Sequence, residues 1–510
     1  MRPGFDLEGK RVLVMGLART GVVVSLFSAG YGATVTAVDE KPESELAETA
    51  ARLRAAGVRL VLGAHDPAIF LHQDLIVLSP GVPANLPAIE AARSHGIPVW
   101  SEVELAWRFL RGKLVAITGS NGKTTTTALA AHILKTAQIR TLVGGNIGVP
   151  LLALAESSTD SAVTVAEISS FQLETIDKFR PEIGVLLNLT PDHLDRHSSF
   201  EAYAAAKMRM FENQREGDAA ILNADDPEVA RRMPSSPRIF WFSRQKRVAA
   251  GAFVRDGQII FRAEGDEIPL FRRDEIPLRG EHNLENVLAA SAAAYLAGAE
   301  PAAIAAGVKT FRAVEHRLEF IAEIRGVSFY NDSKATNVDA SLKAIEAFPG
   351  PLIVILGGKD KGAPYAPLRE PLRQRARLAI LIGAATEKIR SELEGSVPIT
   401  NAGTLDRAVQ VAMDSAQRGD TVLLAPACAS FDQFENYEHR GRAFKDLVAR
   451  LERQSKITDS RIDLDRRESD DSAAEGSPDS IAQKNRDPIA PESHDPIVQK
   501  SHDSIVHRKS

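Results

Sequence analysis

Residues 114–125 read Leu-Val-Ala-Ile-Thr-Gly-Ser-Asn-Gly-Lys-Thr-Thr, and this stretch indicates the fold more strongly than any other part of the chain. Leu114 to Thr118 is a continuous apolar run of the kind found in buried parallel strands. The glycines that follow allow a sharp turn of backbone amides toward an anion, and a helix beginning near Lys123 adds its positive N-terminus. Thr124 can offer its hydroxyl to Mg²⁺. We therefore predict a strand–loop–helix phosphate site, although Ile117 stands where the standard phosphate loop has a glycine.

On both sides of this loop, short β-rich runs alternate with amphipathic helical patterns, which is typical of α/β domains built on parallel sheets. At 510 residues the chain is also longer than one hydrophobic core usually supports. We predict three consecutive doubly wound α/β domains, with a Rossmann-like first domain, a central P-loop domain and a Rossmann-like last domain. Their expected bounds are 1–101, 102–313 and 314–453.

The last segment, 454–510, has a different composition. No aromatic residue follows Phe444, and a degenerate eight-residue repeat begins at Asp479, Asp487, Asp495 and Asp503. Such a segment cannot bury enough apolar surface to offset the entropy lost on ordering, so we predict that it is disordered. Metal binding by the histidines of the repeat is the less favoured alternative.

Composition and charge limit the functional classes. The net charge of -5 disfavours a nucleic-acid partner. A single cysteine, Cys428, excludes an internal disulfide and is expected to be a small buried residue. No apolar run has the length of a signal peptide or of a membrane-spanning helix. We therefore expect a cytoplasmic protein, and we expect it to be a monomer.

Several further motifs follow the phosphate loop, and together they carry a family resemblance. They are Gly144-Gly-Asn-Ile-Gly148, Glu167-Ile-Ser-Ser-Phe-Gln-Leu-Glu174, Asn188-Leu-Thr-Pro-Asp-His-Leu-Asp195, Gly280-Glu-His-Asn-Leu-Glu-Asn286, Glu315-His-Arg317 and Asn331-Asp-Ser-Lys-Ala-Thr-Asn337. With these motifs the chain resembles the ATP-dependent amide ligases of the Mur family from about residue 8 to residue 450.

The resemblance implies an ATP site and a catalytic group with two Mg²⁺ ions. The implied ATP contacts are Gly119, Ser120, Asn121, Gly122, Lys123, Thr124, Thr125, Asn283, Asn286, Arg317 and Asp332. The implied catalytic residues are Lys123, Glu167, His193 and Lys207. Thr124, Glu167, His193 and a Lys207 carbamylated by CO₂ would hold the metal, because an anionic oxygen ligand suits a hard cation. On pattern alone, His193 would more often be a capping histidine and Lys207 a solvated lysine on a helix.

The first domain contains a second glycine-rich turn, Met15-Gly-Leu-Ala-Arg-Thr-Gly21, with Asp39 at the end of the next strand. A dinucleotide site needs a second glycine where Ala18 stands, which weakens an oxidoreductase hypothesis. The turn instead resembles the nucleotide-sugar module of the D-glutamate-adding Mur ligases. This implies UDP-substrate contacts from Arg19, Thr20, Asp39, Lys41, Ser79, Pro80, Gly81 and Asn146. Relatives typically carry arginine at position 41, so Lys41 keeps the charge without the bidentate fork.

The last domain contains the residues that indicate the acceptor, which is the amino acid that the ligase adds. By the same resemblance the D-glutamate contacts are Lys334, Thr336, Lys361, Ser430, Phe431 and Tyr437, and the Asn-Pro-Arg signature of the diaminopimelate-adding relatives is not found. Cations with hydroxyl or amide donors suit a dicarboxylate. For Phe431 and Tyr437 the alternative is a core role, because aromatic residues beside a strand are more often core.

The implied substrates are UDP-N-acetylmuramoyl-L-alanine, D-glutamate and ATP. The resemblance implies that ATP converts the first substrate to an acyl phosphate, with which D-glutamate then reacts. The identity of the residue that accepts the proton of the attacking amine stays open. Three alternatives also stay open: a Mur or folylpolyglutamate-type ligase with another acceptor, a nicotinamide dehydrogenase, and a non-catalytic P-loop switch.

Overall fold

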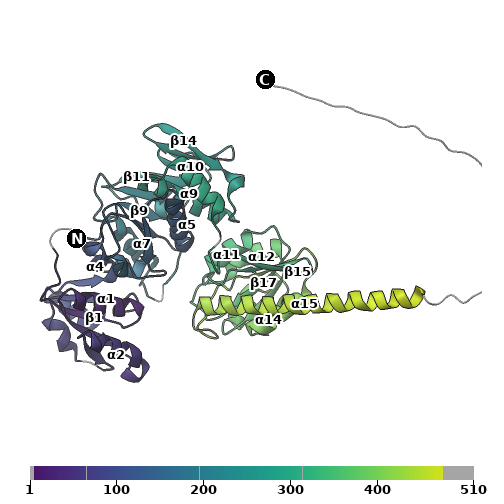
Figure 1. The fold of residues 1–510 in the computed structure, drawn as a ribbon, viewed down its shortest axis with the longest axis horizontal. Coiled ribbons are helices and arrows are strands. Elements are labelled where there is room, and N and C mark those ends of the chain that lie inside the picture. The colour runs from purple at the N-terminus through teal and green to yellow at the C-terminus, as the bar shows by residue number, and fades with distance from the viewer. Residues whose placement is uncertain (1–4, 65, 194–195, 313, 475–510) are drawn as a thin grey trace, which may run out of the picture. The chain divides into compact units, whose positions relative to one another are not determined.

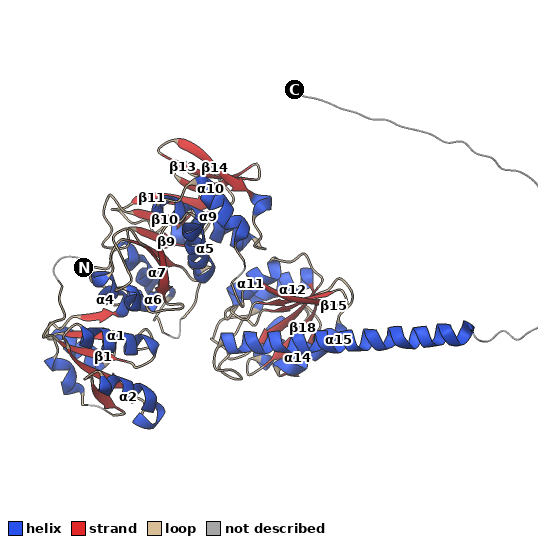
Figure 2. Cartoon of the chain, viewed as in Figure 1, coloured by secondary structure: helices blue, strands red, loops and turns tan. Residues whose placement is uncertain are grey.

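The computed structural model describes residues 5–64, 66–193, 196–312 and 314–474, with side chains described as far as residue 456. Three β-sheets, each covered by helices, follow one another along the chain (Figures 1 and 2). The predicted succession of three α/β domains is confirmed. The predicted domain bounds stay a prediction.

The first sheet is fully parallel, with strand order β3-β2-β1-β4-β5. Its strands are β1 (Arg11–Met15), β2 (Thr34–Asp39), β3 (Arg59–Leu62), β4 (Leu75–Leu78) and β5 (Val99–Ser101), and its helices are α1 (Arg19–Gly30), α2 (Ala47–Ala55) and α3 (Pro87–Ser94). The strand order reverses between β1 and β4, which is where doubly wound folds bind ligands. Helix α4 (Glu102–Phe109) leads to the second sheet. Phe109 packs edge-on against Phe27 of α1 and against Tyr31, which directly follows α1.

The second sheet has nine strands in the order β14-β13-β12-β11-β10-β9-β6-β8-β7, and only the β12–β13–β14 end is antiparallel. Its strands are β6 (Lys113–Thr118), β7 (Thr141–Gly145), β8 (Val163–Glu167), β9 (Ile183–Leu186), β10 (Ala219–Asn223), β11 (Arg238–Ser243), β12 (Gly251–Arg255), β13 (Gln258–Ala263) and β14 (Asp266–Arg272). Its helices are α5 (Lys123–Thr136), α6 (Ser170–Leu173), α7 (Phe200–Met208), α8 (Pro227–Ala230), α9 (Glu281–Ala297) and α10 (Pro301–Thr310). Leu129 and Ile133 of α5 pack with Val287 of α9 in one core, which fixes the helix that follows the phosphate loop.

The third sheet has the order β15-β16-β20-β17-β18-β19 and is parallel except for β15. Its strands are β15 (Glu319–Ile324), β16 (Val327–Asn331), β17 (Leu352–Gly357), β18 (Ala376–Ile382), β19 (Ile399–Gly403) and β20 (Thr421–Leu424). Its helices are α11 (Val338–Glu346), α12 (Arg369–Arg375), α13 (Thr386–Leu393), α14 (Leu405–Ser415) and α15 (Tyr437–Ala474). Each face of this sheet has its own apolar core.

Short 3₁₀ helices complete the fold. They are η1 (Glu43–Glu45), η2 (Pro67–His72), η3 (Leu151–Leu154), η4 (Arg209–Phe211), η5 (Arg273–Glu275) and η6 (Ala366–Leu368).

Helix α15 runs into the segment that composition predicts to be disordered. Its first turns bury Phe444 and Val448 against the third sheet, and its backbone continues as helix through residues 454–474. The rest of that segment, 475–510, lies outside the described residues.

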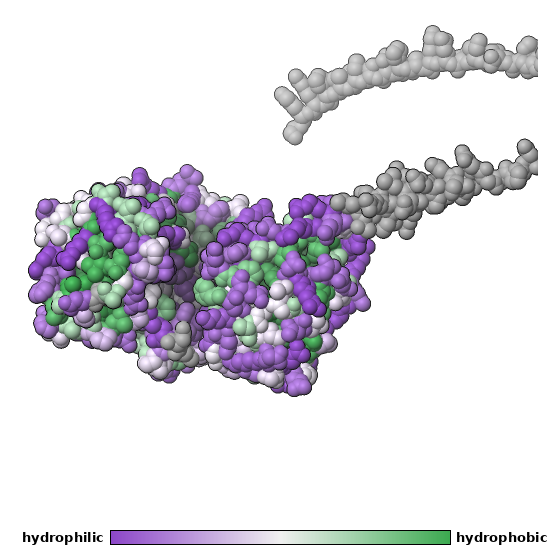
Figure 3. Space-filling view, turned by 90° about the horizontal axis from the view of Figure 1, so that it is seen from below, coloured by the Kyte–Doolittle hydropathy of each residue, from purple (hydrophilic) through white to green (hydrophobic). Residues whose placement is uncertain are grey.

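The surface of the described chain is mixed. Hydrophilic and apolar residues are interspersed on the face shown in Figure 3. The exposed large apolar side chains among the described residues are Val149, Met233, Phe320 and Phe431. No helix in the described part of the chain is long and apolar enough to cross a membrane.

Candidate active site

The phosphate loop lies between β6 and α5, as predicted, and neighbouring segments hold its backbone in place. The Asn121 amide donates to Asn188 Oδ1 at 2.8 Å, and the Ser120 hydroxyl donates to the Thr190 carbonyl at 2.9 Å. Gly122 precedes α5 with φ +86°, and a Cβ there would lie 2.2 Å from Asn286 Oδ1. The positive φ therefore favours glycine at this position, and any larger residue would also displace the Asn286 amide.

Two oxygen-bearing side chains meet at the start of α5. Thr124 Oγ1 donates to Glu167 Oε2 at 2.8 Å, because Glu167 ends β8 beside β6. Asn146 Nδ2 donates to the other carboxylate oxygen at 2.9 Å. The structure thus places Asn146 beside Glu167, the predicted catalytic carboxylate, and not with the first-sheet residues predicted to share its UDP-substrate role. Hydroxyl, carboxylate and amide oxygens are the donors that Mg²⁺ prefers, so this set fits the implied metal.

Lys207 lies beneath the loop and is fully buried. Its ammonium donates to the Gly119 carbonyl at 2.9 Å and lies 4.6 Å from the centre of the Tyr203 ring. Burial, together with the charge of Lys123, holds the pKa of Lys207 well below its ordinary value. Tyr203 in turn donates to Ser120 Oγ at 2.9 Å, a contact that sequence spacing did not suggest.

Lys123 also lies against its own loop. Its ammonium donates to the carbonyls of Gly119 and Ser120, both at 2.8 Å. Burial lowers the pKa of Lys123. The two lysines therefore place two amines at the base of the loop.

His193 has a left-handed backbone, with φ +54°. Burial lowers its pKa, as do the charges of Lys361, Lys123 and Lys207, and Asp192 opposes them. The neutral imidazole is the form that ligates a metal or accepts a proton.

Asp192, which the sequence motif contained without an assigned role, faces the same groups. Burial raises the pKa of Asp192, but the charges of His193, Lys361 and Lys123 outweigh it and leave the pKa below its ordinary value. Its Oδ2 accepts a hydrogen bond from Asn337 Nδ2 at 3.2 Å.

A cavity of about 350 Å³ lies beside the phosphate loop. It is lined by Asn121, Gly122, Thr125, Asn283, Asn286, Arg317 and Asp332 among others, so it brings together seven of the predicted ATP contacts. Asn286 Nδ2 donates to Asn283 Oδ1 at 3.0 Å, and Thr126 donates to Asn286 Oδ1 at 3.2 Å. His282 and Tyr330 also line the cavity, although no sequence argument had selected them.

Arg317 and Asp332 come to this cavity from the third-sheet domain. Burial raises the pKa of Asp332 to about 7, and the Arg317 charge opposes this. The Nε of Arg317 is buried without a hydrogen-bond partner among the described residues. A buried donor left unpaired costs free energy, so Arg317 is suited to a ligand that accepts hydrogen bonds.

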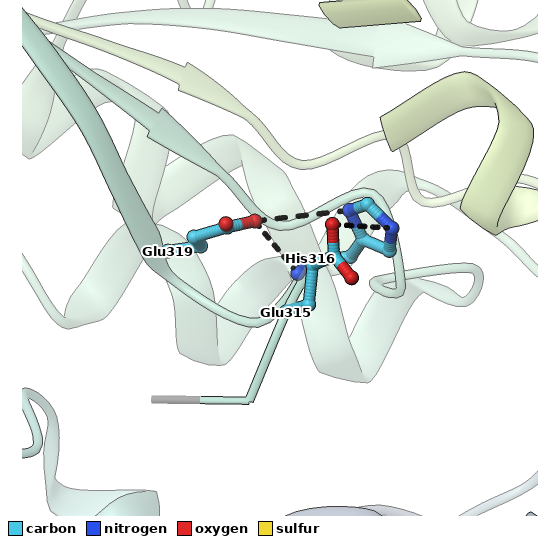
Figure 4. Close-up of side chains that lie close together, drawn as sticks. All are labelled: Glu315, His316 and Glu319. Carbon is cyan, nitrogen blue, oxygen red and sulfur yellow. Dashed lines mark hydrogen bonds and ion pairs between the residues drawn. The ribbon is translucent and has the colours of Figure 1, made fainter. Parts of the chain in front are cut away.

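Glu315, His316 and Glu319 form a compact group at the turn that carries Arg317 (Figure 4). Their ligand atoms lie within 4.8 Å of one another, as in a metal site. The ammonium of Lys445 from α15, however, donates to Glu315 at 2.9 Å and to Glu319 at 2.7 Å. One ammonium of the protein already bridges these two carboxylates and offsets part of their charge, so the group anchors α15 to the turn that carries Arg317.

The predicted acceptor residues lie at the loops of the third-sheet domain. Lys334 Nζ donates to the Tyr437 hydroxyl at 2.8 Å and lies over its ring. Burial, together with the charge of Arg317, lowers the pKa of Lys334 to about 8. Thr336 is tied to Lys334 through a backbone hydrogen bond of 2.8 Å, and Lys361 is exposed.

Two further predicted acceptor residues follow β20. Ser430 is buried, whereas Phe431 is 67% exposed. Phe431 therefore does not have the core role that aromatic residues beside a strand more often take.

The remaining residues predicted to bind the UDP substrate gather at the carboxyl edge of the first sheet. Asp39 accepts backbone hydrogen bonds from Leu17 at 2.6 Å and from Lys41 at 3.0 Å. Ser79 Oγ donates to the Gly16 carbonyl at 2.7 Å. Arg19, Lys41 and Gly81 are exposed there, and Thr20 and Pro80 are half-buried. This edge, at the point where the strand order reverses, presents cations and a helix N-terminus to a ligand.

Three family models match this chain. They are "Mur ligase MurD-like, N-terminal domain" over residues 10–101, "Mur ligase middle domain" over 117–294 and "Mur ligase, glutamate ligase domain" over 316–428.

Curated relatives match the chain along almost their whole length. The UDP-N-acetylmuramoylalanine--D-glutamate ligase of Acidobacterium capsulatum is 56% identical over 446 residues, which cover 87% of this chain and 97% of the relative. The ligase of the same description from Koribacter versatilis is 52% identical over 454 residues, which cover 88% of this chain and 100% of the relative.

Solved structures share the fold. A pseudomurein peptide ligase type C from Methanothermus fervidus matches with TM-score 0.55 and 20% identity, covering 87% of this chain and 100% of that one. A MurF ligase from Thermotoga maritima in complex with ADP matches with TM-score 0.55 and 18% identity, covering 88% and 100%. At these identities the likeness concerns the fold alone.

Proposed function

This chain belongs to the Mur ligase family, and we propose that its three sheets divide the substrates of the D-glutamate-adding reaction among them. The enzyme is an ATP-dependent ligase that adds D-glutamate in peptidoglycan precursor synthesis. Identity above 50% over nearly the full length of relatives with this description is the observation that carries the assignment. The other substrate is UDP-N-acetylmuramoyl-L-alanine.

The reaction that we propose has two steps. In the first, the terminal carboxylate of the alanine attacks the γ-phosphorus of ATP, an oxygen–phosphorus bond forms, and ADP leaves. In the second, the amine of D-glutamate attacks the carbonyl carbon of the acyl phosphate, a carbon–nitrogen bond forms, and phosphate leaves. The support is the phosphate loop with Lys123 at its base, since preorganised cations stabilise a transferring phosphoryl group.

We assign two Mg²⁺ ions to the residues around Glu167 and His193. Thr124 and Glu167 would hold one, and His193 with a carbamylated Lys207 would hold the other. Bound Mg²⁺ offsets the charge of the phosphoryl oxygens. The burial of Lys207 supports the modification, because a neutral amine can attack CO₂, form a nitrogen–carbon bond and release a proton to give an anionic carbamate.

The acceptor binds at the third sheet in this proposal. Lys334 and Lys361 supply cations for the two carboxylates of D-glutamate, and Thr336, Ser430 and Tyr437 supply hydroxyls. Phe431, which is exposed beside Ser430, is available to cover the acceptor.

The UDP portion of the other substrate binds at the carboxyl edge of the first sheet. The helix N-terminus of α1 and the exposed Arg19 and Lys41 suit its diphosphate. We further propose that the enzyme acts as a monomer, since one chain supplies all of these groups, and in the cytoplasm, where ATP is available.

The test is phosphate release by the purified protein with ATP, Mg²⁺ and UDP-N-acetylmuramoyl-L-alanine. D-glutamate is compared with L-glutamate, L-alanine, L-lysine and meso-diaminopimelate, and the amide product is identified by mass. Release confined to D-glutamate is expected. Phosphate release with another of these acceptors would overturn the assignment of the acceptor residues. If no acceptor gives phosphate release, the same assay is repeated with pteroate substrates.

A further inference from the structure

Helix α11 begins directly against the phosphate loop. Asn337 caps the helix, since its Oδ1 accepts from the Ala340 amide at 2.8 Å. The other end of the same amide, Nδ2, donates to Asp192 Oδ2 at 3.2 Å and lies 3.5 Å from Asn121 Oδ1. A helix of the third-sheet domain is thus joined by hydrogen bonds to two loops of the P-loop domain.

Asp339, two residues further along α11, makes the shortest of these contacts. Asn121 Nδ2 of the phosphate loop donates to Asp339 Oδ2 at 2.5 Å, and Thr190 Oγ1 lies 3.4 Å from the same oxygen. Lys343, one turn later, pairs with this oxygen at 2.9 Å. The Asp339 side chain is about one quarter exposed, with 24% of its surface accessible, so water screens this group only in part.

The roles assigned so far do not use Asp339. The residues assigned to the nucleotide and the acceptor in this segment end at Thr336. Asp339 is not among the described residues that line the nucleotide cavity, although its partners Asn121 and Lys343 are. Its partner Asn121 is 218 residues away in the chain. A hydrogen bond to a carboxylate is stronger than one between neutral groups, so this contact is suited to hold two domains together.

The contact has a consequence for catalysis. Lys123 and Glu167 belong to the P-loop domain, whereas Arg317, Lys334 and Lys361 belong to the third-sheet domain. The amine of the acceptor reaches the acyl phosphate only when the loops of the two domains face each other. An interaction that exists only in that arrangement increases the population of the arrangement. Loss of the interaction therefore weakens the apparent affinity for any ligand that needs the arrangement.

We propose that Asp339 is a positioning residue, which acts through Asn121 and Thr190 to hold the acceptor loops over the phosphate loop during the reaction. The inference rests on the proposed function, because it assumes that D-glutamate binds at the third-sheet domain. Asn337 contributes the second contact of the same junction through Asp192.

The experiment compares Asp339→Ala, Asp339→Asn and a matched control, Asp406→Ala. Asp406 is an exposed acid at the equivalent second position of α14 in the same domain, so its removal costs the same favourable interaction with a helix N-terminus. Steady-state kinetics are measured with D-glutamate varied, and binding of UDP-N-acetylmuramoyl-L-alanine is measured by calorimetry.

For Asp339→Ala we expect the KM for D-glutamate to rise about tenfold, as expected for a lost charge-assisted hydrogen bond. Asp339→Asn keeps an oxygen acceptor and should stay within about threefold of the wild type. Asp406→Ala should leave the KM unchanged. UDP-substrate binding, which uses the first two domains, should be unchanged in all variants. Turnover at saturating D-glutamate near that of the wild type reports that the third-sheet domain of each variant is folded.

A double-mutant cycle with Asn121→Ala supplies the second test. If the two side chains act through their mutual contact, Asp339→Ala has a much smaller effect when Asn121 is already absent. The inference would be overturned if Asp339→Ala and Asn121→Ala changed the KM for D-glutamate independently, so that their two factors multiply in the double mutant. It would also be overturned if the Asp339→Ala enzyme had the wild-type KM for D-glutamate. A wild-type enzyme without D-glutamate-dependent phosphate release would instead refute the proposed function, so the two failures are distinguishable.

Discussion

The Nζ atom of Lys207 lies 2.9 Å from the carbonyl oxygen of Gly119, the first residue of the phosphate loop, and the Lys207 side chain is fully buried. Within the described part of the chain, no carboxylate lies at ion-pair distance from it. A buried ammonium without such a partner is costly, and the charge of Lys123 adds to the cost. Conversion of Lys207 to an anionic group would remove this repulsion and provide an oxygen ligand.

Lys207→Ala should lose most of the turnover, by about a hundredfold or more, because the proposed metal ligand is removed. A short-chain carboxylic acid added to the assay should restore part of the activity by placing a carboxylate in the vacated space. Lys207→Arg is the control: it keeps the charge but cannot take up CO₂, so it should stay inactive. Unchanged turnover in Lys207→Ala would remove Lys207 from the site. Isotopically labelled CO₂ should also give a carbamate signal by NMR in the wild type that Lys207→Ala lacks.

From the lowered pKa of Lys334 we predict that acceptor binding depends on pH. Its pKa is lowered to about 8, so the ammonium is present below that pH and is lost as the pH rises through it. The KM for D-glutamate should therefore increase several-fold between about pH 7 and 9. Lys334→Arg keeps its charge over this range and should give a flatter profile. A wild-type KM that stays constant over the same range would show that the Lys334 charge does not bind the acceptor.

Glu102 in α4 predicts a pH dependence of stability. Burial raises its pKa to about 7, backbone amides of Leu152 and Leu151 oppose this, and its Oε2 has no hydrogen-bond partner among the described residues. Since the folded-state pKa exceeds the unfolded value, the stability that this group contributes is present at low pH and is lost as pH rises toward 7. The melting temperature of Glu102→Gln should therefore rise relative to that of the wild type as the pH increases from about 5 to 8.

The matched control for this measurement is Glu104, on the same helix. It accepts backbone hydrogen bonds from Asp177, Lys178 and Phe179 and pairs with Arg108 at 2.7 Å. Glu104→Gln should lower the melting temperature across the range, because charge-assisted hydrogen bonds are lost. A constant difference between Glu102→Gln and the wild type at all pH values would contradict the buried-acid explanation.

Removing the residues from about 455 to 510 should leave ligase activity near that of the full chain. Their composition supplies no apolar core, and an alignment of 454 residues covers the whole of one relative but 88% of this chain. Turnover and soluble yield of the truncated and full chains are compared at equal concentration. A collapse of either quantity on truncation would assign a role to this segment.

Local patterns account for much of the fold. The apolar run Leu114 to Thr118, the glycines after it and the helix at Lys123 are neighbours in the chain, so strand, turn and helix propensities together predict the phosphate loop. The same alternation of strands and helices predicts three α/β domains. The site residues came from family resemblance, because spacing alone favours a solvated lysine at position 207.

The contacts that complete the site could not be predicted in this way. Asn146 belongs with Glu167 because β7 and β8 pair in register, and Asp192 faces Asn337 across two domains. Sequence specifies which side chains can donate, accept or carry charge, whereas packing of the sheets sets which of them meet. Asp339 illustrates the difference, because no local pattern relates it to Asn121, and the 2.5 Å contact arises from where the third-sheet domain places the first turn of α11.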